Sequence, residues 1–172
     1  MAQNPDAIRA IVLDIDGVLT DGRLIPLADG DLLRIVDAKD SLAVRVAVMK
    51  GYVVGIISGG DTVALHKRML SLGISEENLM LGTRGKMAAF RKFCAQNALK
   101  PEEVMYIGDD LPDVPVLEAC GYGIAPADAA FEAKQAADKV SEFGGGKLCV
   151  RTEIEALMRR QGTWEFDYAK VF

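Results

Sequence analysis

The sequence is poor in cysteine. Its three cysteines, Cys94, Cys120 and Cys149, lie far apart and form no CxxC pair. An odd and widely spaced set of this kind argues against both a disulfide framework and a zinc site. We therefore expect three buried and inert thiols.

Long apolar runs and clusters of basic residues are also missing. Half of the 172 residues are hydrophobic, but no run approaches the roughly twenty apolar residues that a membrane helix needs. The net charge of −5 is spread along the chain, without a lysine or arginine block that could follow a phosphate backbone. The N-terminal segment has no basic stretch followed by an apolar one, as a secretory signal would. We therefore expect a cytoplasmic protein that binds neither membranes nor nucleic acids.

The sequence does contain alternating short β-branched runs and amphipathic stretches, which are typical of strand–helix units around a parallel sheet. We predict strands at Ala10–Leu13, Val53–Ile57, Asn78–Leu81, Val104–Ile107 and Gly121–Ile124. Helices are predicted at Ser41–Lys50, Thr62–Leu72, Lys86–Asn97, Val114–Ala119, Ala129–Ala137 and Thr152–Gln161. No repeat, linker or low-complexity segment divides the chain, so we expect residues 1–172 to form a single domain.

Two segments stand outside this alternation. Leu24–Pro26 and Leu32–Ile35 flank a Gly/Asp turn, which predicts a β-hairpin over about residues 24–35, inserted after the first strand. The C-terminal tail, from about residue 162 to residue 172, is rich in aromatic side chains that need a surface to pack against: Trp164, Phe166, Tyr168 and Phe172.

Polar and small residues follow four of the predicted strands. In chain order they are Asp14 and Asp16, Ser58 and Gly59, Lys86, and Asp109 and Asp110. Each residue type alone is commonly a cap, a turn residue or a solvated side chain. The carboxyl ends of parallel strands share one edge of the sheet, however, so the set as a whole indicates a functional site at that edge.

This combination suits phosphoryl transfer. Asp14, Asp16 and Asp109 would crowd negative charges together, and Mg²⁺ would compensate them because it prefers carboxylates, waters and phosphate oxygens. The metal would also neutralise a phosphate enough for a carboxylate to approach it. Lys86 and Ser58 would hold the remaining phosphoryl oxygens, and the glycine after Ser58 would let the backbone come close to the ligand.

The single isoleucine between Asp14 and Asp16 raises a geometric question. In a continued strand the alternation of side chains would govern where the two carboxylates point. We expect a tight turn at Gly17 to end the strand and to fold both carboxylates onto the same phosphate.

The segments DIDGVLTDG (Asp14–Gly22) and GDDLPD (Gly108–Asp113), with Ser58 and Lys86 between them, resemble the four motifs of the haloacid dehalogenase-type phosphatases, in the same order. The resemblance covers most of the chain and implies an α/β fold, a Rossmann-like three-layer sandwich with a mostly parallel sheet. Larger members carry a cap domain over the site. Here the sequence has room only for the short hairpin and for no insertion of domain size, so the chain is expected to be capless.

The same resemblance implies roles for the acidic residues. Asp14 would be the nucleophile that forms an aspartyl-phosphate, and Asp16 the acid/base that protonates the leaving oxygen and later activates water. Mg²⁺ would be bound by Asp14, Asp109 and the backbone carbonyl of Asp16. Asp110 and Asp113 would order the metal's waters or Lys86 from behind.

Among capless members, the chain resembles the phosphatases of 3-deoxy-D-manno-octulosonate 8-phosphate, an eight-carbon sugar-acid phosphate that leads to lipopolysaccharide. The matching features are GVLTDG, the hairpin, Lys39-Asp40, the segment from Arg68 to Ile74, and the run Gly144–Gly146 followed by Arg151. The chain departs from the pattern in three places: Ser41–Ala43 stands for Gly-Tyr-Gly, Gly60 for arginine and Thr152 for glutamate. A nine-carbon ulosonate 9-phosphate therefore remains the alternative substrate.

Three further expectations concern recognition and assembly. Arg68 is a candidate partner for the substrate carboxylate, or else a solvated helix arginine. The resemblance implies a homotetramer in which hairpins pack together and a neighbouring subunit borders each site. The tail would then lie near a neighbour's active-site entrance, or else pack on its own domain.

A receiver domain of a signalling system is the alternative from another class, because it also joins acids, a hydroxyl and a lysine on an α/β sheet. In receivers the acidic pair precedes the phospho-acceptor, whereas here the further acids come late. Asp16 also argues for an enzyme, since a phosphatase needs an acid for the leaving group and a receiver does not.

Overall fold

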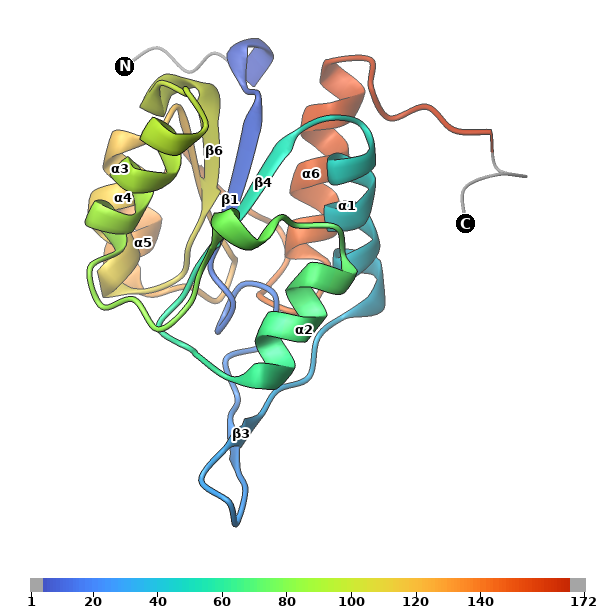
Figure 1. Ribbon diagram of the computed structural model, residues 1–172. Helices are drawn as coiled ribbons and strands as arrows, with labels where there is room; N and C mark the ends of the chain where they lie inside the picture. Colours follow the sequence, from blue (N-terminus) through green and yellow to red (C-terminus); the bar gives the residue numbers. More distant parts are fainter. Residues whose placement is uncertain (1–4, 168–172) are drawn as a thin grey trace.

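The computed structural model describes residues 5–167, which form a central parallel sheet between layers of helices (Figure 1). The strand order is β5-β4-β1-β6-β7-β8, and every neighbouring pair is parallel. The strands are β1 (Ala10–Leu13), β4 (Val53–Ile57), β5 (Leu79–Met80), β6 (Val104–Ile107), β7 (Tyr122–Ala125) and β8 (Lys139–Val140). β1 lies inside the sheet between β4 and β6, so its carboxyl end is flanked by two other strand ends.

Within residues 5–167, five α-helices connect the strands, and a sixth follows β8: α1 (Ala38–Met49), α2 (Val63–Ser71), α3 (Lys86–Gln96), α4 (Val114–Ala119), α5 (Phe131–Ala136) and, last, α6 (Cys149–Arg160). Short 3-10 helices lie at Pro5–Ala7, Glu76–Asn78, Pro101–Glu103 and Leu111–Asp113. The predicted bounds of β1, β4, β6 and α4 are confirmed. β5 is shorter than predicted, and β8 was missed because two residues are too few to show a strand pattern.

Alternation along the central strands divides the core into two halves. Ile11, Leu13 and Ile56 face the side that α1, α2 and α6 cover, whereas Val12 and Tyr106 face α3, α4 and α5. β1 and β6 are buried along their whole length, as expected of parallel strands that are covered on both faces. The predicted three-layer α/β sandwich is therefore confirmed.

The predicted hairpin is present and projects from the carboxyl edge of the sheet (Figure 1). It pairs β2 (Ile25–Pro26) with β3 (Leu32–Leu33) in antiparallel register, and Leu27 N donates to Asp31 O at 2.9 Å to close the turn. The connection from β1 to α1 spans residues 14–37 and contains this hairpin. The hairpin leaves several large apolar side chains exposed: Leu24, Ile25, Leu27, Leu33 and Ile35.

The described part of the C-terminal tail packs on its own chain. Trp164 is 9% exposed and meets Phe166 edge-on at 5.0 Å between ring centroids. The Arg151 guanidinium lies 4.9 Å from the centre of the Trp164 ring, and Lys50 Nζ donates to Glu165 O at 2.6 Å. Up to Phe166, packing on the tail's own domain is therefore confirmed, at the end of α6 away from the hairpin (Figure 1). Tyr168 and Phe172 lie outside the described residues.

Two composition-based expectations can be compared with the structure. The three cysteines are buried free thiols, as predicted, and burial raises the pKa of Cys94 to about 11. Among residues 5–167, no helix is both long enough and apolar enough to cross a membrane.

Candidate active site

Asp14 lies directly after β1, in the row of strand ends. Its backbone N–H donates to Ile107 O at 3.0 Å, which continues the pairing with β6 one residue beyond the strand. Its side chain is only 5% exposed. Oδ1 accepts from Ile15 N at 2.7 Å, and Oδ2 accepts from Lys86 Nζ at 2.6 Å. The carboxylate is thus held in a fixed orientation by one backbone and one ionic contact.

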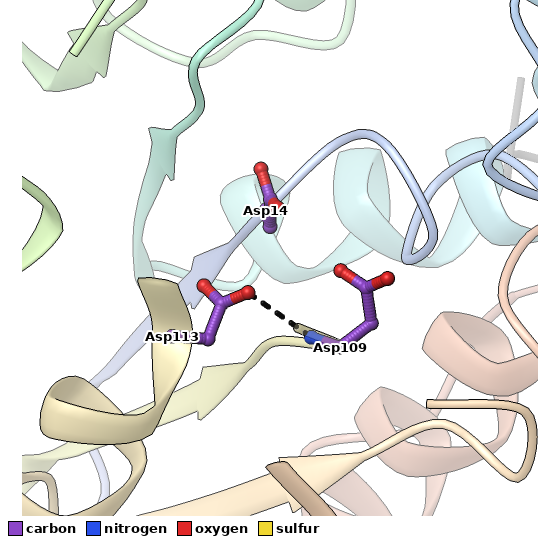
Figure 2. Close-up of side chains that lie close together, drawn as sticks. All are labelled: Asp14, Asp109 and Asp113. Carbon is purple, nitrogen blue, oxygen red and sulfur yellow. Dashed lines mark hydrogen bonds between the residues drawn. The ribbon is translucent and has the colours of Figure 1, made fainter. Parts of the chain in front are cut away.

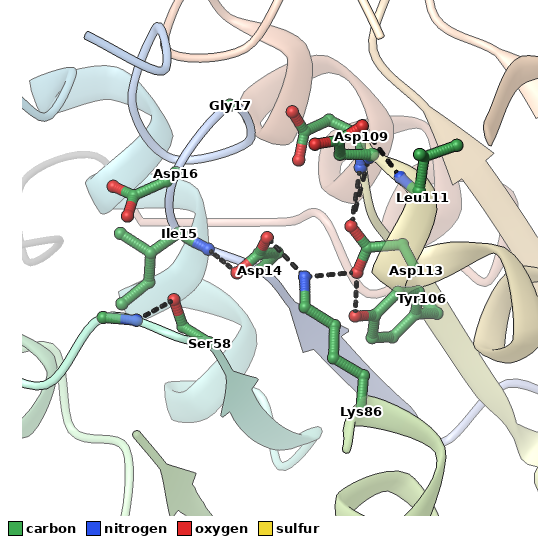
Figure 3. A network of polar contacts seen from close by, with 12 residues as sticks. Asp14, Ile15, Asp16, Gly17, Ser58, Lys86, Tyr106, Asp109, Leu111 and Asp113 are labelled. Atoms are coloured by element: carbon green, nitrogen blue, oxygen red, sulfur yellow. Dashed lines mark hydrogen bonds and ion pairs between the residues drawn. The ribbon is translucent and has the colours of Figure 1, made fainter. Parts of the chain in front are cut away.

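Lys86 comes from the first position of α3 and joins two carboxylates (Figure 3). Its Nζ donates to Asp14 Oδ2 and to Asp113 Oδ1, each at 2.6 Å, and its side chain is 7% exposed. A lone Lys86 would be costly to bury, but two carboxylates within hydrogen-bond distance compensate its charge. The expectation that Lys86 reaches the strand-end acids is confirmed.

Asp113 is fully buried, and both of its oxygens are occupied. Oδ1 accepts from Lys86 and from the Tyr106 hydroxyl, and Oδ2 accepts from the N–H groups of Asp109 and Asp110 at 3.2 Å. Asp113 therefore orients both the lysine and the loop that carries Asp109. Asp110 is exposed, and its Oδ1 caps Leu111 N at 2.8 Å, so Asp113 and not Asp110 contacts Lys86.

Asp14, Asp109 and Asp113 each offer an oxygen within 4.8 Å of the others (Figure 2). Asp109 Oδ1 is buried and has no hydrogen-bond partner. An unpaired buried carboxylate oxygen beside a second carboxylate fits a hard cation such as Mg²⁺, which supplies the missing charge and ligand. Because the oxygens of Asp113 already accept from Lys86, Tyr106 and two backbone amides, Asp14 and Asp109 are the side chains best placed to hold the metal.

The crowding of these acids shifts their protonation. Burial raises the pKa of Asp14 to about 6, although the Lys86 ammonium group acts in the opposite direction. Burial and the neighbouring Asp14 charge raise the pKa of Asp109 to about 7. Burial by itself would lower the pKa of Lys86. The Asp14 and Asp113 carboxylates have a larger effect in the opposite direction, so the pKa of Lys86 is raised. The site thus favours a positive charge beyond the one that Lys86 provides.

Gly17 makes the turn that ends the β1 segment. Its φ is +88°, and a Cβ there would lie 1.9 Å from Asp109 Oδ2. Both the left-handed backbone and the close approach therefore require glycine. The Thr20 hydroxyl accepts from the N–H groups of Gly17 and Gly22 and stabilises the turn. The predicted tight turn is confirmed.

The expected convergence of Asp14 and Asp16 on one point is not observed. Asp16 points away from the Asp14–Lys86–Asp113 cluster (Figure 3). The reason is an ion pair with the hairpin: Arg34 Nε and Nη2 donate to the two Asp16 oxygens at 2.6 and 2.9 Å. Arg34 is a residue of the candidate site that the sequence pattern did not indicate. Its only signal was the position of the hairpin directly after the acidic motif.

The other predicted residues divide between the site and its surroundings. Ser58 follows the last residue of β4, is 1% exposed and accepts from Gly60 N at 3.2 Å, while Gly59 lies exposed beside it. Arg68 lies on α2 and lines a second cavity of about 280 Å³ between α2 and the hairpin, which adjoins the cavity at Asp16 through Arg34. Ser58 and Gly59 thus share the edge with Asp14, whereas Arg68 does not line the cavity that borders Asp16.

A buried aspartate holds the start of α6, and the glycine run that precedes α6 packs on the loop after β1. Asp40, which is 0% exposed, accepts from Leu148 N and Arg151 N at 3.3 and 2.7 Å and so joins α1 to the start of α6. The preceding glycine run then packs on the turn, with Gly146 N donating to Val18 O at 2.8 Å. A Cβ at position 145 would lie 1.8 Å from Gly17 O, so this contact also requires glycine.

Comparisons with known proteins agree with this geometry. A model of the haloacid dehalogenase-like hydrolase family matches residues 77–143. The chain is 34% identical to a 3-deoxy-D-manno-octulosonate 8-phosphate phosphatase of Haemophilus influenzae, over all of this chain and 95% of the relative.

Solved structures extend the similarity to the fold. A cobalt-bound structure of the Haemophilus influenzae phosphatase has a TM-score of 0.90 at 34% identity, covering 98% of each chain. The phosphatase of Moraxella catarrhalis, solved with magnesium, phosphate and KDO, has a TM-score of 0.88 at 26% identity, covering 93% of this chain and 91% of that one.

The parallel sheet, the buried contacts of Lys86 with Asp14 and Asp113, and the relatives together identify the chain as a phosphoric monoester hydrolase. The chain belongs to the haloacid dehalogenase-like hydrolases, and among them to the family of the 3-deoxy-D-manno-octulosonate 8-phosphate phosphatases. Membership in this enzyme family excludes the receiver-domain alternative.

Proposed function

We propose that this chain hydrolyses 3-deoxy-D-manno-octulosonate 8-phosphate and releases the free sugar acid for lipopolysaccharide synthesis in the cytoplasm. The observation that carries the proposal is the buried Asp14–Lys86–Asp113 network at the strand ends, in a chain whose full-length relatives are phosphatases of this substrate. The relative solved with magnesium, phosphate and KDO supports the same substrate class and metal.

Asp14 is the proposed nucleophile. Its carboxylate attacks phosphorus, forms an aspartyl-phosphate and displaces the sugar oxygen, which takes a proton from Asp16. Asp16 then removes a proton from water, which attacks the aspartyl-phosphate and releases inorganic phosphate. Lys86 and the Ser58 hydroxyl hold phosphoryl oxygens, and Gly59 lets the backbone approach them.

The metal is proposed to be Mg²⁺, held by Asp14, Asp109 and the backbone carbonyl of Asp16. When bound, Mg²⁺ neutralises phosphate charge as the nucleophile approaches. The unpaired Oδ1 of Asp109 supports this assignment. Asp113 positions Lys86 and the backbone of residues 109 and 110 and is not itself proposed as a ligand.

The active form is proposed to be a homotetramer. The hairpin exposes Ile25 and Ile35 to 52% and 71%, and such apolar side chains are typical of surfaces that become buried on assembly. A neighbouring hairpin would enclose the carboxyl edge, over which residues 5–167 place no cap domain.

Turnover of a phosphate ester panel tests the proposed substrate. The panel contains the eight-carbon ulosonate 8-phosphate, a nine-carbon ulosonate 9-phosphate, neutral aldose phosphates and para-nitrophenyl phosphate, each with Mg²⁺. We expect the highest kcat/KM for the eight-carbon ester, and no turnover by D14N, which is the control for contaminating phosphatases. A higher kcat/KM for the nine-carbon ester or for a neutral sugar phosphate would contradict the substrate assignment.

A further inference from the structure

A cavity of about 660 Å³ borders the candidate active site on the hairpin side. Asp16 forms part of its wall, together with the hairpin and the loop that follows Ser58. A substrate whose phosphate lies at Asp14 would extend into this space, because the opposite side is filled by Lys86, Asp113 and Tyr106. The residues that line the cavity therefore select what the phosphate is attached to.

The charges of this wall are unequal. Among the described residues that line it, the acids are Asp16, Asp29, Asp31 and Asp61, and Arg34 is the cation. An anionic group on the substrate would be repelled by most of the wall and attracted at one place. That place is the Arg34 guanidinium, which Leu32 O helps to fix by accepting from Nη1 at 3.2 Å.

The Arg34 guanidinium already has the geometry of a carboxylate site. Its side chain is only 5% exposed, and its Nε and Nη2 hold both oxygens of Asp16 in the paired arrangement in which guanidinium binds a carboxylate. Gly60 leaves room for it, since a Cβ at that position would lie 2.9 Å from Arg34 Nη2. Asp16 is thus an internal carboxylate at a place where an external one can bind.

We propose that Arg34 binds the carboxylate of the substrate and thereby selects sugar-acid phosphates over neutral ones. The substrate carboxylate takes the place of the Asp16 carboxylate on the guanidinium, and the Asp16 side chain becomes free to turn toward the leaving oxygen. Recognition of the acid group and placement of Asp16 are then one event. The inference rests on the proposed function, because it assigns the acid-binding residue of the same site.

Arg34 replaces Arg68 as the candidate for this contact. Arg68 Nε is buried without a partner, but Arg68 lines only the cavity between α2 and the hairpin, whereas Arg34 lines both that cavity and the one that Asp16 borders.

The test compares R34M with the wild-type enzyme on two pairs of phosphate esters, each made of one ester that carries a carboxylate and one that does not. The pairs are 3-deoxy-D-manno-octulosonate 8-phosphate with ribose 5-phosphate, and 3-phosphoglycerate with glycerol 3-phosphate. The measured quantity is the ratio of kcat/KM within each pair. We expect R34M to lower the preference for the acid roughly 10- to 100-fold, the value of one charged hydrogen-bonded pair. R34K should restore only part of it, because an ammonium group cannot form the paired contact.

Arg23 provides the matched control, because it lies at the base of the same hairpin and its side chain is 87% exposed. R23M should keep the wild-type ratio in every pair. Melting curves establish that each variant is folded, and the ratio itself cancels any general loss of activity. Equal losses on both members of a pair, or an unchanged ratio in R34M, would overturn the inference.

Failure of the substrate proposal gives a different result. If the wild-type enzyme hydrolyses phosphate esters but does not prefer the ulosonate, the substrate assignment is wrong, while the phosphoglycerate pair still tests Arg34. A wild-type enzyme that shows no carboxylate preference in either pair would contradict the assignment of Arg34 directly.

Discussion

Removal of one negative charge from the proposed metal site should stabilise the metal-free protein. Burial and the Asp14 charge raise the pKa of Asp109 from 3.8 to about 7, so the folded state resists ionisation of this carboxyl. A shift of about three pKa units corresponds to about 4 kcal/mol. Because solvent reaches part of Asp109 and screens its charge, we discount the penalty to about 2 kcal/mol. D109N avoids this penalty, and its amide can donate to the neighbouring carboxylates.

The pH dependence of this stability difference follows from proton binding to Asp109. Below about pH 4 Asp109 is protonated in both the folded and unfolded states, and D109N should match the wild-type stability. Between about pH 4 and pH 7 the unfolded chain loses this proton first, so wild-type stability falls as the pH rises. The advantage of D109N should therefore develop across this window and be complete above pH 7.

Urea denaturation in EDTA measures this effect, with the fluorescence of Trp164 as the signal. At pH 7.5 we expect the free energy of unfolding of D109N to exceed that of the wild type by about 2 kcal/mol. Saturating Mg²⁺ should reverse the order, because only the wild type keeps both metal-binding carboxylates. D110N is the control: it removes a neighbouring exposed charge, keeps a capping side chain, and should change stability by less than about 0.5 kcal/mol. A metal-free D109N no more stable than the wild type at pH 7.5 would refute this reasoning.

Three further predictions follow from the site and its surroundings. D14N should fold normally and lose turnover, because an amide is a poor nucleophile; near wild-type kinetics in a pure preparation would rule out the covalent mechanism. G17A should lower the free energy of unfolding by at least about 1 kcal/mol and reduce kcat, since the new Cβ would collide with Asp109; a stable, active variant would contradict the tight turn. Light scattering should give the mass of four chains, and a monomeric mass would contradict the assembly. A chain ending at Asp167, which keeps the Trp164 packing, should show a raised KM; an unchanged KM would contradict a role for the last residues at a neighbour's site.

Much of the fold and of the candidate site at the carboxyl edge could be predicted from the sequence. The runs of β1, β4 and β6 are fully or almost fully apolar, because these strands are covered on both sides, and such runs have recognisable ends. Polar residues that follow the carboxyl ends of parallel strands share an edge whatever the details of packing. Asp14, Ser58 and Lys86 could therefore be placed at one site from their order in the chain.

Only the tertiary structure decided which charges pair. Asp16 is bound by Arg34 and so points away from Asp14, and Asp113 rather than Asp110 contacts Lys86. Asp40, deep in the core, supports the glycine run at α6. These contacts join residues from different helices, strands and loops. The partner of a side chain depends on the relative positions of these elements, which local sequence patterns do not predict. Periodicity and strand ends determined where the site lies, whereas long-range packing determined the direction in which each of its carboxylates points.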